Sequence, residues 1–504
     1  MSSVYAGFGF RVSEIGDVEV VRHGGLYHLF HLVLPNHDYI AHAVSEDGLS
    51  WERVENAIFI NDPGGWDDDM LWTMSVSPDP HVSGGWRMFY TGLSMRDRGR
   101  VQRVGLARSA NLFDWHKDES GAFPLELTAA PYEHDIDEGR HWVSFRDPYY
   151  LRVDGKGYLL AAGRVERGPV IRRGAVALLE EVAPDRFEPR EPLFHPSRYD
   201  DIEVPVPVQL DGRWYLLGSI REDVKVHYWY ADRFEGPYLN FSDNVLLPQG
   251  NYAARVSRDE DRLLVWNFFF KGQVTDGQHL LPPPKELKAD ERGELYLASF
   301  SGFDSRVSRT RDADELLPLE PLFGIDTAVS EVDDGVARFG TDSGFETFLL
   351  EGRHRDFRLH GELHMDGAGK IGLVLRIDEN GDGYYLSLDL HKGIAQLRAW
   401  AAHPGGDVER AFDYIPLQSN FYVAHGDPHP FVLLAYGSYL EFSLDGAVLL
   451  TLSDERFYEG RVGFYTESAR LRLHHLRLET MECPEDEPYT THTVEGGGAP
   501  GADD

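Results

Sequence analysis

Residues 145–163, FRDPYYLRVDGKGYLLAAG, contain in one stretch the pattern that decides the fold. A carboxylate, Asp147, opens a short apolar run, a charged turn with glycines follows, and an aromatic strand of the type Tyr-x-Leu returns. Asp17 precedes a similar segment, VEVVRHGGLYHLFH, and Glu203 opens a third, EVPVPVQLDGRWYLLGS. A repeated supersecondary unit that presents an acid at the same point can bring its acids together around one axis. The sequence therefore predicts three converging carboxylates.

The returning aromatic strand recurs five times in the first three hundred or so residues, as LYHLFH (26–31), WRMFYTG (86–92), GYLLAAG (157–163), WYLLGS (214–219) and RLLVWNFF (262–269). A polar turn and an outer strand with Trp or Phe follow most copies, as in AVSEDGLSWERV and LARSANLFDWHKD. The returning strand and the outer strand after it thus recur together at a period of about fifty to seventy residues, which is typical of four-stranded propeller blades. We expect an all-β protein whose residues 1–305 form a five-bladed β-propeller.

The pattern changes after the fifth repeat. A charged, proline-containing connector is expected over residues 306–335, followed by a second strand-rich region over 336–482. Regular strands with Asp-Gly and Asn-Gly turns, as in GKIGLVLRIDENGDGYYLSLDL, predict a β-sandwich of the jelly-roll or concanavalin type. Residues 483–504, which end in VEGGGAPGADD, have the composition of a disordered tail.

Composition restricts the partners. The formal charge of −35, from 84 acidic and 49 basic residues, argues against nucleic acid and anionic membrane surfaces and favours neutral or cationic partners. The single cysteine, Cys483, excludes an intrachain disulfide and a thiolate metal cluster. The N-terminal segment lacks a basic region followed by an apolar one, so the chain as given is expected to be cytoplasmic, or secreted if a signal peptide has been trimmed. The sequence does not predict the oligomeric state.

Several motifs together resemble glycoside hydrolase family 32, the β-fructofuranosidase group. Residues 145–148, Phe-Arg-Asp-Pro, match the family's Arg-Asp-Pro motif, and residues 203–205, Glu-Val-Pro, stand for its Glu-Cys-Pro. Residues 89–92, Phe-Tyr-Thr-Gly, which follow the segment Trp-Thr-Met-Ser at 72–75, also resemble the family. The stretch LLPPPKELKADERGELYL is similar to the family's segment that leaves the last blade of the propeller. The resemblance implies a five-bladed propeller joined to a β-sandwich and a carbohydrate substrate.

The resemblance also implies roles for the three acids. Asp17 would be the nucleophile, Glu203 the general acid and base, and Asp147 a stabiliser of the transition state. Arg146 would orient the carboxylates or bind hydroxyl groups. Aromatic side chains and one further acid near the second repeat are candidates for contact with the sugar, namely Trp66, Asp68, Trp72 and Tyr90.

The implied activity is that of a retaining exo-glycosidase acting on terminal β-D-fructofuranosides such as those of sucrose, fructooligosaccharides, inulin or levan. The family's Asn-Asp-Pro-Asn-Gly motif is here Gly-Asp-Val-Glu-Val at 16–20, which keeps only the acid. Transfer of the fructosyl group and cleavage of another furanoside, such as an arabinofuranoside, therefore stay open. A carbohydrate-binding propeller without catalysis is the alternative outside the enzyme class.

Two smaller signals concern the sandwich and metals. The sandwich resembles fructan-binding modules of carbohydrate-binding family 66, through LVLRIDENGDGYYLSLD, and a purely structural sandwich is the alternative. The string Asp378-x-Asn380-x-Asp382-Gly383 matches most of a calcium loop but also suits an ordinary hairpin turn. We expect no cofactor, no catalytic metal, and at most a structural calcium ion at this string.

Overall fold

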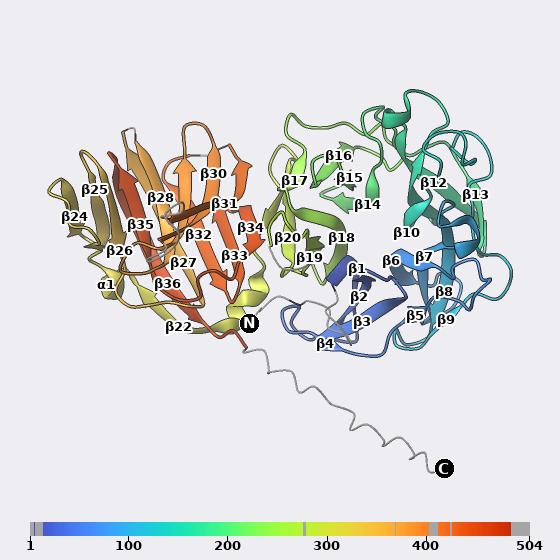
Figure 1. Ribbon diagram of the computed structural model, residues 1–504, viewed down its shortest axis with the longest axis horizontal. Coiled ribbons are helices and arrows are strands. Elements are labelled where there is room, and N and C mark those ends of the chain that lie inside the picture. Colours follow the sequence, from blue (N-terminus) through green and yellow to red (C-terminus); the bar gives the residue numbers. More distant parts are fainter. Residues whose placement is uncertain are drawn as a thin grey trace, which may run out of the picture.

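The structure is a computed structural model that describes residues 5, 14–275, 279–367, 369–402, 412–423 and 426–484. Figure 1 shows a propeller, seen along its axis, beside a β-sandwich. This arrangement confirms the predicted fold class. Within the described residues, helical structure is limited to α1 (Ala313–Leu316) and three 3-10 turns at Met95–Asp97, Val170–Arg172 and Ser301–Arg306. None of the described helices is long and apolar enough to cross a membrane.

Each blade is an antiparallel sheet whose strands follow one another in chain order. Blade 1 comprises β1 (Glu14–His23), β2 (Leu26–Leu34), β3 (Tyr39–Ser45) and β4 (Glu52–Arg53), with β5 (Ile58–Phe59) also paired to β3. Blade 2 comprises β6 (Met70–Pro78), β7 (Trp86–Leu93), β8 (Arg103–Ser109) and β9 (Trp115–Lys117). Blade 3 comprises β10 (Arg146–Val153), β11 (Lys156–Arg164), β12 (Gly174–Ala183) and β13 (Arg186–Pro189).

The last two blades repeat the same order. Blade 4 comprises β14 (Glu203–Leu210), β15 (Arg213–Ile220), β16 (Lys225–Ala231) and β17 (Val245–Leu247). Blade 5 comprises β18 (Asn251–Asp259), β19 (Arg262–Phe269), β20 (Lys285–Ala289) and β21 (Leu295–Ala298). The first strand of each blade lies innermost, around the axis (Figure 1).

The turns that close the inner hairpins explain why the sequence repeats as it does. Between β10 and β11, Val153 pairs with Lys156 across Asp154 and Gly155, whose φ values are 49° and 82°. Between β14 and β15, Asp211 and Gly212 have φ values of 51° and 78°. Two successive residues with positive φ form the hairpin turn whose twist matches that of the strands, and Asp-Gly tolerates this conformation. The Gly-containing turns of the sequence are thus the hairpin ends of the blades.

All five innermost strands have a register shift near their N-terminal end. The shifts lie between Ile15 and Val18, Trp72 and Met74, Arg146 and Tyr149, Glu203 and Val206, and Tyr252 and Arg255. In three of the strands a residue other than glycine within the shift has positive φ, namely Asp147 at 59°, Val204 at 50° and Ala253 at 55°. Bulges of this kind redirect side chains and are frequent next to active sites.

The sandwich consists of two antiparallel sheets. One contains β22 (Val307–Asp312), β24 (Ala328–Asp333), β25 (Val336–Thr341), β27 (Phe357–Asp366), β32 (His429–Tyr436), β33 (Tyr439–Leu444), β34 (Ala447–Ser453) and β36 (Arg470–Met481). The other contains β23 (Glu320–Pro321), β26 (Phe345–Leu349), β28 (Lys370–Ile377), β29 (Gly383–Asp389), β30 (Ile394–Ala402), β31 (Phe412–Phe421) and β35 (Arg461–Glu467).

The connector expected over 306–335 is in fact part of the sandwich. Its strands β22 and β24 pair with β36 and β25, and β23 pairs with β26. Charged side chains obscured these strands in the sequence because they lie at the sheet edges, where one side of a strand faces solvent. The tail expected over 483–504 falls outside the described residues except for 483 and 484.

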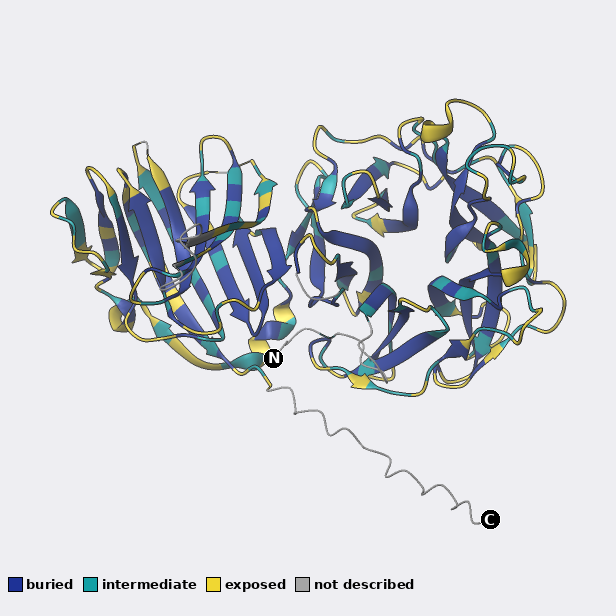
Figure 2. Cartoon of the chain, viewed as in Figure 1, coloured by how far each residue is buried: buried dark blue, intermediate teal, exposed yellow. Residues whose placement is uncertain are grey.

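The two units share a packed boundary. Buried residues dominate the strands of both units, whereas exposed residues gather in the loops (Figure 2). The ring of Phe269 in blade 5 stacks on that of Tyr439 in the sandwich, with centroids 6.2 Å apart. The backbone N–H of Ser453 donates to the carbonyl of Val274 at 3.0 Å. The sandwich is therefore held against the fifth blade.

Candidate active site

The register shifts define equivalent positions around the axis. The last paired residue before each shift is Ile15, Trp72, Arg146, Glu203 and Tyr252 in blades 1 to 5. Glu203 is therefore equivalent to Arg146 and not to Asp147, which is the first residue within its shift. Asp17 is the second residue within the shift of blade 1. The three acids thus stand on three inner strands, as the sequence predicts, but at three successive positions of the repeat.

Two of the carboxylates are held by neighbouring blades. The hydroxyl of Thr73, in the bulge of blade 2, donates to Asp17 Oδ2. The backbone N–H of Val204 in blade 4 donates to Asp147 Oδ2 at 3.0 Å. The backbone N–H of Asp147 donates in turn to Thr91 Oγ1 at 3.1 Å. Each acid is thus positioned across a blade boundary, so the geometry of the site depends on the closure of the ring.

Glu203 is the most heavily bonded of the three acids. Arg146 Nη2 donates to its Oε1 at 2.6 Å, and Arg221 Nη2 donates to the same oxygen at 2.7 Å. The hydroxyl of Tyr252 donates to Oε2. Arg146 Nη2 also contacts Asp201 Oδ2 at 2.9 Å. Both oxygens of Glu203 are therefore oriented from blades 3, 4 and 5.

Burial and mutual repulsion control the ionisation of these groups. Burial, and then the charge of Asp147, raises the pKa of Asp17 to about 7. Burial also raises the pKa of Asp147, against the opposing effect of the Arg146 guanidinium. Burial and the Glu203 carboxylate hold the pKa of the Tyr252 hydroxyl well above its usual range, so this group remains a donor. Asp17 therefore releases its proton near neutral pH.

Among the residues predicted to contact substrate, Arg146 and Trp72 occupy equivalent positions of the ring. Trp72 is partly exposed, and its indole N–H has no hydrogen-bond partner within the part of the chain that the structure describes. The indole nitrogen itself is buried, whereas the exposed part of the ring, next to Thr73 in the chain, suits stacking on a sugar ring.

The other three predicted residues are committed to the structure of blade 2. Tyr90 is 1% exposed and donates to Asp67 at 3.0 Å, which leaves it no surface for direct contact with a substrate and corrects the prediction. Asp68 is 4% exposed and accepts the backbone N–H of Gly64 at 2.7 Å, so it shapes a loop. The Trp66 ring stacks on Tyr90 with centroids 5.7 Å apart. At least one face of the Trp66 ring is therefore packed against the blade.

Sequence reasoning missed the groups that hold the acids, namely Thr73, Arg221 and Tyr252. A signal for Tyr252 exists, because it occupies in the fifth repeat the position of Glu203 in the fourth. Arg221 lies in the turn after β15 and contacts Glu203 although its side chain is 72% exposed. No repeat position marks such a loop residue, so only the structure reveals it.

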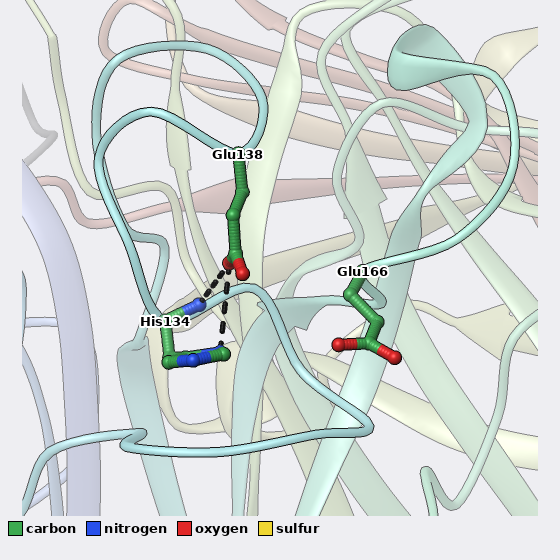
Figure 3. A group of neighbouring side chains, drawn as sticks. All are labelled: His134, Glu138 and Glu166. Carbon is green, nitrogen blue, oxygen red and sulfur yellow. Dashed lines mark hydrogen bonds and ion pairs between the residues drawn. The ribbon is translucent and has the colours of Figure 1, made fainter.

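Two sets of residues carry side chains of the kinds that bind metals. Asp378 Oδ1 accepts the backbone N–H groups of Asn380 and Asp382 at 2.8 and 2.9 Å, which is the bonding of a tight hairpin turn, and a calcium ion there stays a prediction. Figure 3 shows a second group in which potential ligand atoms of His134, Glu138 and Glu166 lie within 4.8 Å of one another. The backbone N–H of His134 donates to Glu138 Oε2 at 2.8 Å, so these two residues, too, are bonded within their loop.

Comparison with known proteins agrees with this architecture. Residues 18–181 match the family model described as the glycosyl hydrolases family 32 N-terminal domain. No curated protein matches the chain in sequence. Fructan 1-exohydrolase IIa from Cichorium intybus has a similar structure, with a TM-score of 0.67 and 15% identity over 95% of this chain and 98% of that one.

Two further solved structures share the fold. Sucrose-6-phosphate hydrolase from Lactobacillus gasseri gives a TM-score of 0.65 at 16% identity, over 93% of this chain and 91% of that one. Exo-inulinase from Aspergillus awamori gives a TM-score of 0.63 at 15% identity, over 92% and 96%. The family match within the propeller and the fold shared with these structures identify the protein as a glycoside hydrolase whose residues 18–181 are similar to the N-terminal domain of glycosyl hydrolases family 32.

Proposed function

We propose that the protein is a retaining exo-glycosidase that hydrolyses terminal β-D-fructofuranosides such as those of sucrose, fructooligosaccharides, inulin or levan. The observation that carries the proposal is the meeting of Asp17, Asp147 and Glu203, from three inner strands, where their charges act on one another. The similar structures include enzymes named for sucrose 6-phosphate, fructan and inulin, which supports a fructoside as substrate.

In the proposed mechanism, the Asp17 carboxylate attacks the anomeric carbon while Glu203 protonates the departing oxygen. A water molecule, deprotonated by Glu203, then displaces Asp17 from the covalent intermediate. Asp147 accepts hydrogen bonds from hydroxyls of the sugar, which strengthen as positive charge develops on the ring. Tyr252 and Arg146 keep the two oxygens of Glu203 in place while it first releases and then accepts a proton.

A substrate panel tests the proposal. Purified protein is incubated with sucrose, inulin, levan and an aryl arabinofuranoside, and released monosaccharides are quantified with and without a glycosyl acceptor. We expect free fructose from the fructosides, with the β-anomer formed first in the NMR spectrum. Predominant transfer to the acceptor would identify a fructosyltransferase, and release from the arabinoside alone would identify another furanosidase. Binding without any release would refute hydrolysis.

For the sandwich we infer a separate role in glycan binding, which rests on one surface feature. The outer face of the β28–β29–β30 sheet carries a row of aromatic rings, in which Tyr385 and Trp400 have centroids 5.6 Å apart. A cleft of about 390 Å³ there is lined by these rings, Phe323, Phe345, Asn380 and Asp382, among others. Aromatic faces beside carboxylate and amide groups suit sugar rings and their hydroxyls.

A single substitution separates this role from catalysis. We expect Trp400→Ala to weaken retardation of the protein in gels containing inulin or levan, and to leave turnover of sucrose unchanged. Tyr458→Ala is the control, because Tyr458 is 40% exposed, similar to the 41% of Trp400, and is absent from the cleft lining. Equal retardation of wild type and both variants would show that the sandwich is only structural.

A further inference from the structure

A buried arginine crosses the axial channel of the propeller. Arg255 belongs to β18 of blade 5 and is 1% exposed. Its Nη2 donates to the carbonyls of Met74 in blade 2 and Pro148 in blade 3, at 3.1 and 3.0 Å. Its Nε lies 3.2 Å from Glu19 Oε2 in blade 1, and its guanidinium carbon lies 5.3 Å from the ring centroid of Tyr149. One side chain therefore bonds to the inner strands of three other blades.

The groups that Arg255 contacts lie next to the proposed catalytic residues. Met74 directly follows Thr73, whose hydroxyl donates to Asp17. Pro148 directly follows Asp147. Glu19 comes two residues after Asp17 in β1, and residues two apart in a strand share a face. Arg255 therefore lies in a second layer of side chains around the axis, next to the layer that contains the three proposed catalytic carboxylates.

Among the groups that act most strongly on Asp17, Arg255 is the cation. Asp147 and Glu203 oppose its ionisation, and the Arg255 charge favours it. The other buried guanidinium of this region, Arg146, bonds to Asp201 and Glu203 instead. The Glu19 carboxylate neutralises Arg255 only in part, because burial raises the pKa of Glu19 to about 7.

We propose that Arg255 is a positioning residue of the hydrolase. It fixes the carbonyl groups of Met74 and Pro148, which follow Thr73 and Asp147, and it places a permanent positive charge beneath Asp17. The proposal rests on the proposed function in taking Asp17 as the nucleophile. The charge keeps this carboxylate ionised against two neighbouring acids, and the two carbonyl bonds hold the bulges that aim Thr73 and Asp147 at the substrate. Within the described residues, Arg255 Nη1 has no hydrogen-bond acceptor, so the guanidinium is not saturated by the fold alone.

The alternative is that Arg255 has a purely structural role and only holds the blades together. The effects of its charge and of its hydrogen bonds can be separated, because Arg255→Lys keeps the charge but cannot reproduce the planar guanidinium, whereas Arg255→Met removes both. Both substitutions are made in a Glu19→Gln background, so that no lone carboxylate is left buried. If that background does not fold, the same two substitutions are made in the wild-type chain, where Glu19 can take up a proton.

The main readout does not require catalysis. Each protein is prepared with and without the additional substitution Asp17→Asn, and the difference in unfolding free energy between the two members of the pair is followed against pH. The midpoint of that curve lies halfway between the pKa values of Asp17 in the unfolded and folded states, so it moves when the pKa of the folded state changes. The matched control is Arg87→Met with Glu181→Gln, another buried pair, with a 2.9 Å contact, that joins blades 2 and 3 away from Asp17.

We expect the Met variant to raise the pKa of Asp17 in the folded state by about one unit, which moves the midpoint upward by about half a pH unit. The Lys variant and the control pair should leave the midpoint in place. We also expect kcat to fall in both Arg255 variants, about tenfold for the loss of a buried hydrogen bond, with KM little changed. An identical midpoint for the wild-type, Lys and Met forms would overturn the proposal. Absence of turnover in every form would refute the proposed function instead, while the midpoints would still decide whether Arg255 acts on Asp17.

Discussion

Replacing Asp17 by asparagine is expected to abolish hydrolysis and, at the same time, to stabilise the protein at alkaline pH. The pKa of Asp17 is about 7 in the folded protein, against an ordinary value of 3.8. An acid whose folded pKa is raised makes unfolding easier as pH rises between these two values, because the unfolded chain releases its proton first. At about 1.4 kcal/mol per pH unit, the cost reaches at most about 4 kcal/mol above pH 7.

The asparagine side chain of the Asp17→Asn variant carries no such cost and can still accept the hydrogen bond from Thr73. The variant should therefore equal wild type in stability below pH 4 and exceed it increasingly up to pH 7, with a plateau above. Chemical denaturation at several pH values measures this, and kcat should fall by about four to six orders of magnitude, as for other catalytic nucleophiles.

The control for this experiment is Asp211→Asn, which removes one acidic charge from an exposed turn of blade 4. It should change neither turnover nor the pH dependence of stability. Two results would refute the reasoning. If the Asp17→Asn variant were less stable than wild type at pH 8, Asp17 would be a structural carboxylate, and if turnover survived, it would not be the nucleophile.

Three further outcomes follow from the same contacts. Because Asp17 must be ionised to attack, kcat/KM should decrease tenfold per pH unit below about pH 7, and a profile flat down to pH 5 would exclude that pKa for the nucleophile. Tyr252→Phe removes the hydroxyl that donates to Glu203 and should lower kcat by about 10- to 100-fold with little effect on thermal unfolding, since a bond to a charged group is worth about 1.5–3 kcal/mol. Gly105→Ala would place a methyl group 2.5 Å from the Trp66 ring and should cost about 1–3 kcal/mol in unfolding free energy, so an unchanged melting temperature would argue against that packing.

The repeat made the propeller predictable from sequence, because each blade places an apolar inner strand, a connecting turn and an aromatic return strand in the same order. In blades 1, 3 and 4 the turn is a tight Gly-Gly or Asp-Gly pair. Asp17 and Glu203 could be found for the same reason. What the sequence could not provide is the register. A bulge adds a residue without changing composition, so Glu203 and Asp147 look equivalent in the sequence although strand pairing separates them by one position.

Residues that act across blades were also hidden. Arg255 and Glu19 lie far apart in the sequence and meet only when the ring closes. Tyr90 illustrates the opposite error, since an aromatic residue in a family-like motif was taken for a substrate contact although it packs under Trp66. Burial decides between these roles, and burial of an aromatic residue in a strand depends on its neighbours in space.

The most direct test of the account is to trap the covalent intermediate. Glu203→Gln removes the base of the second step, so an aryl fructofuranoside, whose leaving group needs no protonation, should load the enzyme faster than water can release the sugar. Mass spectrometry of the digested protein is expected to show one fructosyl unit on the peptide that contains Asp17. A fructosyl unit on another residue, or free α-fructose as the first product with no adduct, would contradict the central claim that Asp17 is the nucleophile of a retaining hydrolase.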